Sequence, residues 1–165
     1  MPSTRRRKSE DTGPPGIDGD EKATLVAFLD YLRGAIADKV VGAPEPLVRT
    51  AGVASGTNVL GLVKHLTFVE RFYFLGEDVR NWNATQLPDP TDTIDTVTAA
   101  YREAIGRSNA IIDTYTDLSL PAPKTPRKGK PPSMRWLLVH MIEETGRHAG
   151  HADILREQLD NTTGR

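Results

Sequence analysis

The sequence contains no cysteine among its 165 residues. This absence excludes disulfide bonds, catalysis by a protein thiolate, and zinc fingers built on cysteine. A metal ion bound by this chain must therefore be held by histidine and carboxylate side chains. The lack of cysteine also fits a reducing cytoplasm, which is the expected location.

Neither sign of charge dominates the sequence, and it has no long apolar segment. The 21 basic and 22 acidic residues leave a formal net charge of −1, so no global field favours nucleic acid or an anionic membrane. No segment approaches the roughly 20 apolar residues that a membrane-spanning helix needs. No apolar stretch follows the basic residues near the start, as a signal peptide would require. The sequence therefore predicts a protein that binds neither nucleic acid nor membrane.

The length suits one globular domain with a polar segment at each end. Hydrophobic residues make up 38% of the chain and charged residues 26%, which is the balance of a globular protein. Residues 1–18 are basic, then acidic, and contain Gly and Pro with almost no apolar side chains, which predicts a disordered tail. We expect a single domain over residues 19–160 and a frayed end over residues 161–165.

Apolar residues recur at helical spacing in four long segments, and no segment shows the period of two that is typical of a strand. The expected helices run approximately over residues 20–40, 57–75, 93–116 and 133–159. Their expected N-caps include Asp18 or Asp20, Thr57 or Asn58, and Ser133. The stretches between them, 41–56, 76–92 and the Pro- and Lys-rich LSLPAPKTPRKGKPPS, are expected to be loops. This pattern predicts an all-α fold, a four-helix bundle whose long connections need not give simple up-and-down topology.

Three of the four histidines lie in the last helical segment, in the run WLLVHMIEETGRHAGHADILRE. At about 100° per residue, with His140 at zero, Glu144 falls near 40°, His148 near 80° and His151 near 20°. The apolar stripe of the same helix passes through these angles. A stripe that faces a core is expected to be apolar. A carboxylate buried there is strongly destabilising unless it is paired or bound to a metal.

Glu144 and His148 are four residues apart, so on a helix both side chains can converge on one ion. His65 shows the same anomaly in the second helical segment, where it lies between Leu62 and Val69 on the apolar stripe. If the two helices face one another, His65 is the natural third ligand, because bundle cores build metal sites from inward groups on facing helices. These three residues are the candidate site for a divalent metal.

Each candidate ligand also has an interpretation without a metal. A histidine on an apolar stripe is commonly a core residue that is hydrogen bonded to the backbone or to a partner, and this applies to His65. Glu144 and His148 could equally form an exposed i,i+4 pair. His140 and His151 are explained more readily as groups beside the ligands than as ligands.

Three protein ligands leave open positions for water or substrate, whereas a closed structural site uses four. Two imidazoles and one carboxylate suit Zn²⁺ first, with Ni²⁺, Fe²⁺ or Mn²⁺ as alternatives. The metal would lower the pKa of a bound water or thiol and so provide a nucleophile at neutral pH. A metal-bound imidazole also needs an acceptor for its other N–H, and Glu143, Glu70 or a backbone carbonyl are the candidates.

Few other groups in the sequence can take part in chemistry at this site. His140, His151 and Tyr73 are the candidate catalytic residues for proton transfer. Arg147 is the candidate for binding an anionic part of a cofactor or substrate, and a solvated helix residue is the alternative. Trp136 lines either the cavity or the core, with the core favoured.

Phe72 has the same two interpretations as Trp136, and again the core is favoured. The Pro-rich loop is basic and could gather an anionic ligand, although a solvated loop is the favoured interpretation. Its basic residues are Lys124, Arg127, Lys128 and Lys130. A role in DNA binding would rest only on this loop and on the basic residues near the start.

The stretches SGTNVLGLVKHLTFVERFYF and WLLVHMIEETGRHAGHADILRE resemble the DinB-like superfamily, and more closely its actinobacterial branch. The resemblance implies a four-helix bundle that binds a divalent metal through three side chains. One family ligand is a histidine of the second helix, which corresponds to His65. The other two stand four apart in the last long helix, and many members have histidine at both. The pair Glu144 and His148 matches mycothiol-dependent maleylpyruvate isomerase, while His151 stands where many members have glutamine.

The resemblance also implies a class of reaction. Because the chain has no cysteine, a thiol nucleophile would come from a cofactor, and the resemblance indicates mycothiol or another low-molecular-weight thiol. We therefore expect a metal-dependent enzyme of the thiol-dependent transferase or isomerase kind, acting on a small molecule. A metal-dependent hydrolase is one alternative. A non-enzymatic helical bundle that serves as an interaction module, with a structural metal or none, is the other. Dimers are common among similar proteins, so a homodimer is among the expected assemblies.

Overall fold

The computed structural model describes residues 13–16, 19–124, 129–161 and 163. In these residues the chain forms helices and no strand, so the prediction of an all-α fold is confirmed for this part of the protein. None of the described helices is both long and apolar enough to cross a membrane. The tail expected over residues 1–18 lies mostly outside the described residues, as does most of the end expected to fray over 161–165.

Four of the helices are long. They are α1 (Glu21–Asp38), α3 (Val59–Leu75), α5 (Ile94–Asp113) and α6 (Met134–Asp160). Each begins after a side chain that accepts a hydrogen bond from a backbone amide of the first turn, which satisfies a donor that the helix itself leaves unpaired. These N-caps are Asp20, Asn58, Thr93 and Ser133. α3 ends at Gly76, whose φ of 71° is a conformation that glycine adopts without strain.

Two helices end two or three residues before the approximate ends that the sequence indicates. α1 ends at Asp38 rather than at residue 40, and α5 ends at Asp113 rather than at residue 116. In both places the next amides bond to carbonyls three residues back, as in Lys39 N–H to Ile36 O and Thr114 N–H to Ile111 O. Such bonds tighten the last turn and end the α-helix.

Two one-turn helices interrupt segments that were expected to be loops. α2 (Glu45–Val48) follows α1, and α4 (Trp82–Thr85) follows α3. Asn81 caps α4 by accepting hydrogen bonds from the amides of Asn83 and Ala84. A single turn is too short for apolar periodicity to reveal it, which is why the sequence did not predict these helices.

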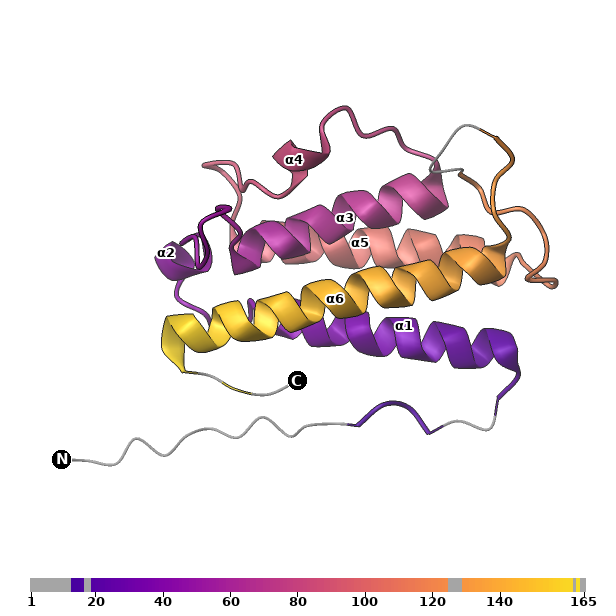
Figure 1. Ribbon diagram of the computed structural model, residues 1–165, viewed down its shortest axis with the longest axis horizontal. Helices are drawn as coiled ribbons and strands as arrows, with labels where there is room; N and C mark the ends of the chain where they lie inside the picture. Colours follow the sequence, from indigo (N-terminus) through magenta and orange to yellow (C-terminus); the bar gives the residue numbers. More distant parts are fainter. Residues whose placement is uncertain (1–12, 17–18, 125–128, 162, 164–165) are drawn as a thin grey trace.

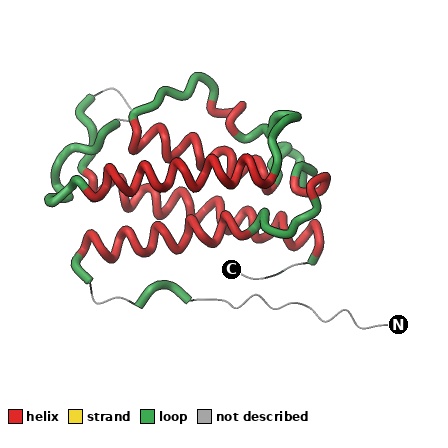
Figure 2. Tube along the Cα trace, turned by 180° about the vertical axis from the view of Figure 1, so that it is seen from behind, coloured by secondary structure: helices red, strands yellow, loops and turns green. Residues whose placement is uncertain are grey.

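The four long helices lie side by side (Figures 1 and 2). They form two parallel pairs, and the colours of Figure 1 show that one pair runs in the opposite direction to the other. α1 packs beside α6 and runs the same way, with Glu21 at the start of α1 bonded to Arg135 at the start of α6 (2.6 Å). α3 packs beside α5, again in the same direction, and Arg71 bonds to Glu103 across this pair (2.9 Å). α3 also contacts α6, which runs antiparallel to it. The topology is therefore not simple up-and-down.

Large apolar side chains fill the space between the four long helices. Removing each from water contributes about 1.5–3 kcal/mol to the stability of the fold. They include Leu29, Ile36, Leu60, Leu62, Leu66, Phe74, Tyr101, Ile112, Leu137, Leu138 and Met141. This core holds the α3 and α6 backbones in fixed positions, so that polar side chains between the two helices meet in a defined geometry.

The connection from α3 to α5 returns along the outside of α3, because these two helices run in the same direction (Figure 1). It is held against α3 at two adjacent turns. A Cβ on Gly61 would lie 2.1 Å from the carbonyl oxygen of Gln86, so only glycine allows this approach. The Lys64 ammonium donates to the carbonyl of Leu87 (3.1 Å) and to Asp92 (2.8 Å). These contacts place α4 over the middle of α3.

Candidate metal centre

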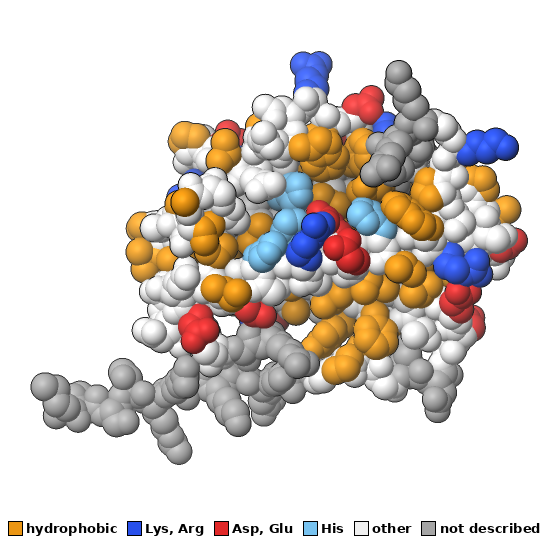
Figure 3. Space-filling model, viewed as in Figure 1, with side chains coloured by type: hydrophobic (Ala, Val, Ile, Leu, Met, Phe, Trp, Pro, Cys, Tyr) orange, Lys and Arg blue, Asp and Glu red, His pale blue; other side chains and the backbone are white. Residues whose placement is uncertain are grey.

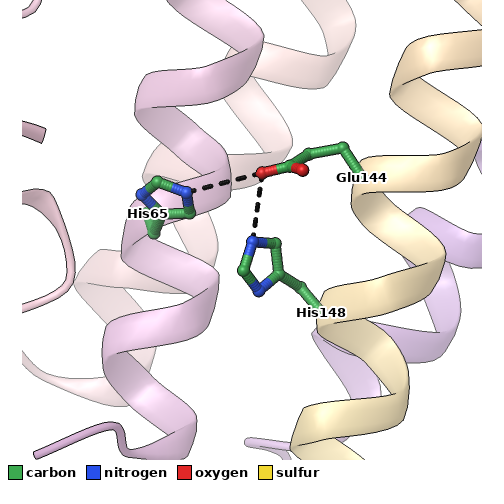
Figure 4. A group of neighbouring side chains, drawn as sticks. All are labelled: His65, Glu144 and His148. Carbon is green, nitrogen blue, oxygen red and sulfur yellow. Dashed lines mark hydrogen bonds and ion pairs between the residues drawn. The ribbon is translucent and has the colours of Figure 1, made fainter. Parts of the chain in front are cut away.

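Three side chains with metal-ligating atoms meet between α3 and α6 (Figure 4). His65 comes from α3, and Glu144 and His148 come from successive turns of α6. The Nε2 atoms of His65 and His148 lie 3.7 and 3.1 Å from Oε1 of Glu144. One ligand atom of each residue lies within 4.8 Å of the other two. The structure thus brings together the three residues, called the triad below, and their binding of a metal stays a prediction.

The triad is nearly buried but not sealed from solvent. Its side chains keep 8% (His65), 13% (Glu144) and 12% (His148) of their full exposure. In Figure 3 histidine side chains gather in the middle of one face of the molecule, around acidic and basic side chains, with hydrophobic side chains beside them. A small molecule approaching this face could therefore reach the triad.

Thr85 determines which nitrogen of His65 faces the triad. Its hydroxyl lies 2.7 Å from Nδ1 of His65 and donates its single proton to the carbonyl of Trp82, at 2.6 Å. The hydroxyl must therefore accept a hydrogen bond from Nδ1–H. In the neutral ring Nε2 then carries a lone pair, which faces the Glu144 carboxylate. This arrangement is repulsive unless a proton or a cation lies between the two groups.

Glu144 is held in its ionised form. The hydrogen bond from His148 is the main cause that holds the pKa of this carboxyl well below its usual range, although burial opposes the shift. Arg147 donates to Oε2, the oxygen that does not face the imidazoles. One carboxylate oxygen is therefore directed at the two histidines, and the other is neutralised by an arginine on the same helix.

The expected acceptors for the outer imidazole nitrogens are not the ones found. Glu70 is bound instead to Arg33, at 2.7 Å, and Glu143 lies 3.7 Å from His140. His65 uses the Thr85 hydroxyl, which sequence reasoning missed because α4 itself was missed. Nδ1 of His148 is buried and has no hydrogen-bond partner among the described residues.

The candidate proton-transfer residues lie on two sides of the triad. His140, one turn before Glu144 on α6, has Nε2 3.0 Å from the hydroxyl of Tyr73 on α3. His151 is exposed, and its ring centroid lies 5.6 Å from that of His148. His140 and Tyr73 therefore form a hydrogen-bonded pair across the α3–α6 contact, whereas His151 lies at the solvent edge.

Trp136 does not lie in the core, and the expectation that favoured the core is wrong for it. It is 46% exposed, and its indole stacks on the His140 ring with 5.0 Å between centroids and 20° between planes. Phe72 is partly buried and contacts Tyr73 and Trp82. Trp82, which sequence reasoning also missed, has its ring centroid 5.8 Å from that of His65.

Lys124 of the basic loop contributes to structure in the described part of the chain. Its ammonium donates to Asp78 (2.6 Å) and to the carbonyl of Gly76 (3.2 Å), and so ties the loop to the end of α3. Lys130 is exposed. Arg127 and Lys128, named with them as candidates for gathering an anionic ligand, lie outside the described residues.

Comparison with known proteins places the chain in a family. A family model described as Mycothiol-S-transferase matches residues 24–161, a range that holds every long helix almost entirely and all three triad residues. No curated protein matches the sequence. The family is DinB-like and related to mycothiol-dependent enzymes, in agreement with the resemblance of the His65 and Glu144–His148 segments. The chain therefore belongs to the mycothiol-S-transferase family.

Proposed function

We propose that this protein is a divalent-metal-dependent S-transferase, which joins mycothiol or another low-molecular-weight thiol to a small electrophilic substrate. Membership of the mycothiol-S-transferase family supports the thiol and the type of reaction. One observation supports a bound metal. The hydrogen bond to Thr85 leaves the Nε2 lone pair of His65 facing the ionised Glu144. A cation between the two would remove the repulsion.

The donor set fits a divalent ion. Ligand atoms about 2.1 Å from one tetrahedral ion lie roughly 3.4 Å from one another. The two nitrogen–oxygen distances in the triad, 3.1 and 3.7 Å, lie on either side of that value. Two imidazoles and a carboxylate suit Zn²⁺ first, and Ni²⁺, Fe²⁺ and Mn²⁺ also bind such sets. His65, Glu144 and His148 would hold the ion.

The thiol has to come from outside the chain, because the sequence has no cysteine. A metal with three protein ligands keeps an open position, where it would bind the thiol and lower its pKa. In the transfer, a bond forms between the thiol sulfur and an electrophilic carbon of the substrate. The bond from that carbon to its leaving group breaks, and the leaving group departs with the electron pair. The proton of the thiol passes to a base.

His140 is the base that the geometry favours. Its ring is held between the indole of Trp136 and the hydroxyl of Tyr73, and it remains partly exposed. An imidazole held in this position can accept the proton of the thiol. His151, exposed at the other edge, would exchange protons with solvent. Arg147, with 52% of its side chain exposed, orients Glu144 and would attract an anionic part of the thiol or substrate.

Metal content tests the site directly. Protein purified without a nickel-affinity step should contain about one divalent ion per chain, and His65→Ala or Glu144→Ala should abolish binding. Glu143→Ala is the matched control, since Glu143 is the exposed neighbour of Glu144 on the same helix and should leave the metal bound. A metal-free wild type whose melting temperature does not change with added Zn²⁺ or Ni²⁺ would contradict the proposal.

Thioether formation tests the reaction. The metal-loaded enzyme, incubated with mycothiol and an alkyl halide, should form the S-alkyl product, which mass spectrometry detects. His65→Ala should form it only at the uncatalysed rate, and Glu157→Ala, which removes an exposed carboxylate near the C-terminal end of α6, should behave as wild type. An absence of both binding and turnover with a panel of low-molecular-weight thiols would overturn S-transfer. Thiol-independent cleavage of esters or amides would indicate a hydrolase instead.

A further inference from the structure

Trp82 lies beside His65 of the triad and Trp136 stacks on His140, one turn before Glu144, and both tryptophans are exposed to solvent. Trp82 of α4 is 37% exposed and Trp136 of α6 is 46% exposed. Tryptophan is normally among the more buried side chains of a protein, since its indole offers a large apolar surface. Exposed aromatic side chains next to polar groups that can react are typical of a binding site.

A continuous series of ring contacts joins the two indoles. We call these residues the aromatic row, in order Trp82, Phe72, Tyr73, His140 and Trp136. Successive ring centroids are 5.2, 5.0, 5.0 and 5.0 Å apart. The row begins at the triad, since the centroid of Trp82 is 5.8 Å from that of His65.

The row is fixed in place by contacts from three separate elements. α4 contributes one ring, α3 two and α6 two. The hydrogen bond between Tyr73 and His140 (3.0 Å) links α3 to α6 within the row. The Lys124 ammonium lies 5.2 Å from the centre of the Phe72 ring. The same ammonium is held in place by a hydrogen bond to the carboxylate of Asp78 (2.6 Å). A surface held in this way loses little conformational freedom when a ligand binds.

The chemistry of the row indicates the kind of ligand it would accept. Aromatic rings attract flat apolar groups through stacking and edge-to-face contacts. The Lys124 ammonium beside Phe72 is already paired with Asp78, and the carboxylate of the triad is paired with Arg147 on its outer side. A flat ring without a formal charge is therefore the ligand that this surface favours.

We propose that the aromatic row binds the second substrate of the transferase, an uncharged electrophile with an aromatic or conjugated ring. The reactive carbon of that substrate would lie beside the triad, at the Trp82 end or over the His140 end of the row. This inference rests on the proposed function, which needs a thiol and an electrophile but does not specify the latter. Trp136 is the residue expected to contribute most to selectivity, because it is the most exposed ring of the row.

A selectivity assay tests the inference with the metal-loaded enzyme at saturating thiol. Phenacyl bromide and bromoacetone carry the same reactive group and leaving group, and differ in that only the first has an aromatic ring. After the uncatalysed rates are subtracted, wild type should have a higher kcat/KM for phenacyl bromide than for bromoacetone. Trp136→Ala should reduce the ratio of the two kcat/KM values by about tenfold, which is the usual effect of lost apolar contact in a substrate site. Trp136→Phe, which keeps a ring, should restore most of the ratio.

Phe28→Ala is the matched control, since Phe28 is an exposed aromatic residue on α1 and lies outside the row. It should leave the ratio at the wild-type value. An unchanged ratio in Trp136→Ala would overturn the inference. So would an increase in the KM for the thiol alone, because the row would then bind the thiol.

A binding measurement separates this inference from the proposed function. Acetophenone, the unreactive analogue of phenacyl bromide, should quench the tryptophan fluorescence of Trp82→Phe, in which Trp136 is the only tryptophan left. Quenching without turnover of either bromide would support the aromatic row and contradict S-transfer. Turnover of both bromides without quenching, and with no preference for the aromatic one, would support S-transfer and contradict the aromatic row.

Discussion

α3 contains the buried polar side chains Glu70 and His65, whose surroundings differ. The carboxylate of Glu70 is fully buried, and both of its oxygens accept hydrogen bonds from Arg33 of α1, each at 2.7 Å. The other donors of this guanidinium bind Asp30 (2.7 Å) and Asn109 (2.8 Å). Arg33 itself is 1% exposed. The pair of Arg33 and Glu70 therefore contains its own cation and is closed to solvent.

In the triad, whose His65 lies before Glu70 on α3, no cationic side chain of the described residues lies between the ligand atoms. Its carboxylate, Glu144, is flanked by two imidazoles, and the nearest guanidinium, that of Arg147, binds only its outer oxygen. The triad is also more exposed than the cluster of Arg33 and Glu70. A buried carboxylate requires compensation. The comparison teaches that compensation from within the chain makes a structural contact, whereas the lone pair and the carboxylate of the triad support the proposal that a cation from outside compensates them.

The largest expected effect comes from removing the internal cation. Arg33→Met should lower the free energy of unfolding by about 3–5 kcal/mol, because Glu70 would be left buried and unpaired. Urea denaturation of the metal-free protein measures this change. The double variant Arg33→Met/Glu70→Leu should recover most of the loss, since no charge then remains buried. Equal instability in the single and double variants would show that the guanidinium matters for its shape or for its other contacts rather than for Glu70.

Adding the external cation should have the next largest effect. At a free Zn²⁺ concentration about 100 times its Kd, the free energy of unfolding should increase by about 2.7 kcal/mol, because only the folded state presents the site. Thermal or urea denaturation with and without Zn²⁺ measures the gain. The double variant that removes the internal ion pair should keep the gain, and Glu144→Ala should lose it. An equal gain in Glu144→Ala would place the metal elsewhere.

A smaller effect is expected from the hydrogen bond that orients His65. Thr85→Val keeps the shape of the side chain but removes the hydroxyl, so the tautomer of His65 is no longer imposed. Metal affinity should fall about 10- to 100-fold, which is the usual effect of losing an outer partner of a ligand histidine. Competition with a chelator measures the affinity, and Thr85→Ser should keep it near the wild-type value. Equal affinities for Val and Ser at this position would contradict the role assigned to the hydroxyl.

The smallest effect is expected at the surface. Arg135 and Glu21 are paired at 2.6 Å but are about half exposed, at 46% and 53%. Water already solvates such charges, so the pair contributes little. The urea midpoint of Arg135→Gln should equal that of wild type within error. A measurable loss would show that this contact, and not only apolar packing, aligns α1 with α6.

Much of the fold could be predicted from local signals. The N-caps Asp20, Asn58 and Ser133 and the stop at Gly76 depend on hydrogen bonds and backbone angles within a few residues. The same locality explains what was missed. α4 is a single turn whose place depends on a close contact with Gly61, and no periodic pattern in the sequence announces that contact.

The candidate site also depends partly on local signals in the sequence and partly on tertiary contacts. The sequence by itself determined that Glu144 and His148 share one face of α6, because the helical period places residues four apart side by side. It also determined that any nucleophilic thiol must come from outside, since there is no cysteine. Only the tertiary structure decided that His65 reaches that face, because this depends on how α3 packs against α6. It alone decided that Thr85 orients His65, because parallel α3 and α5 require a crossover that returns over the site.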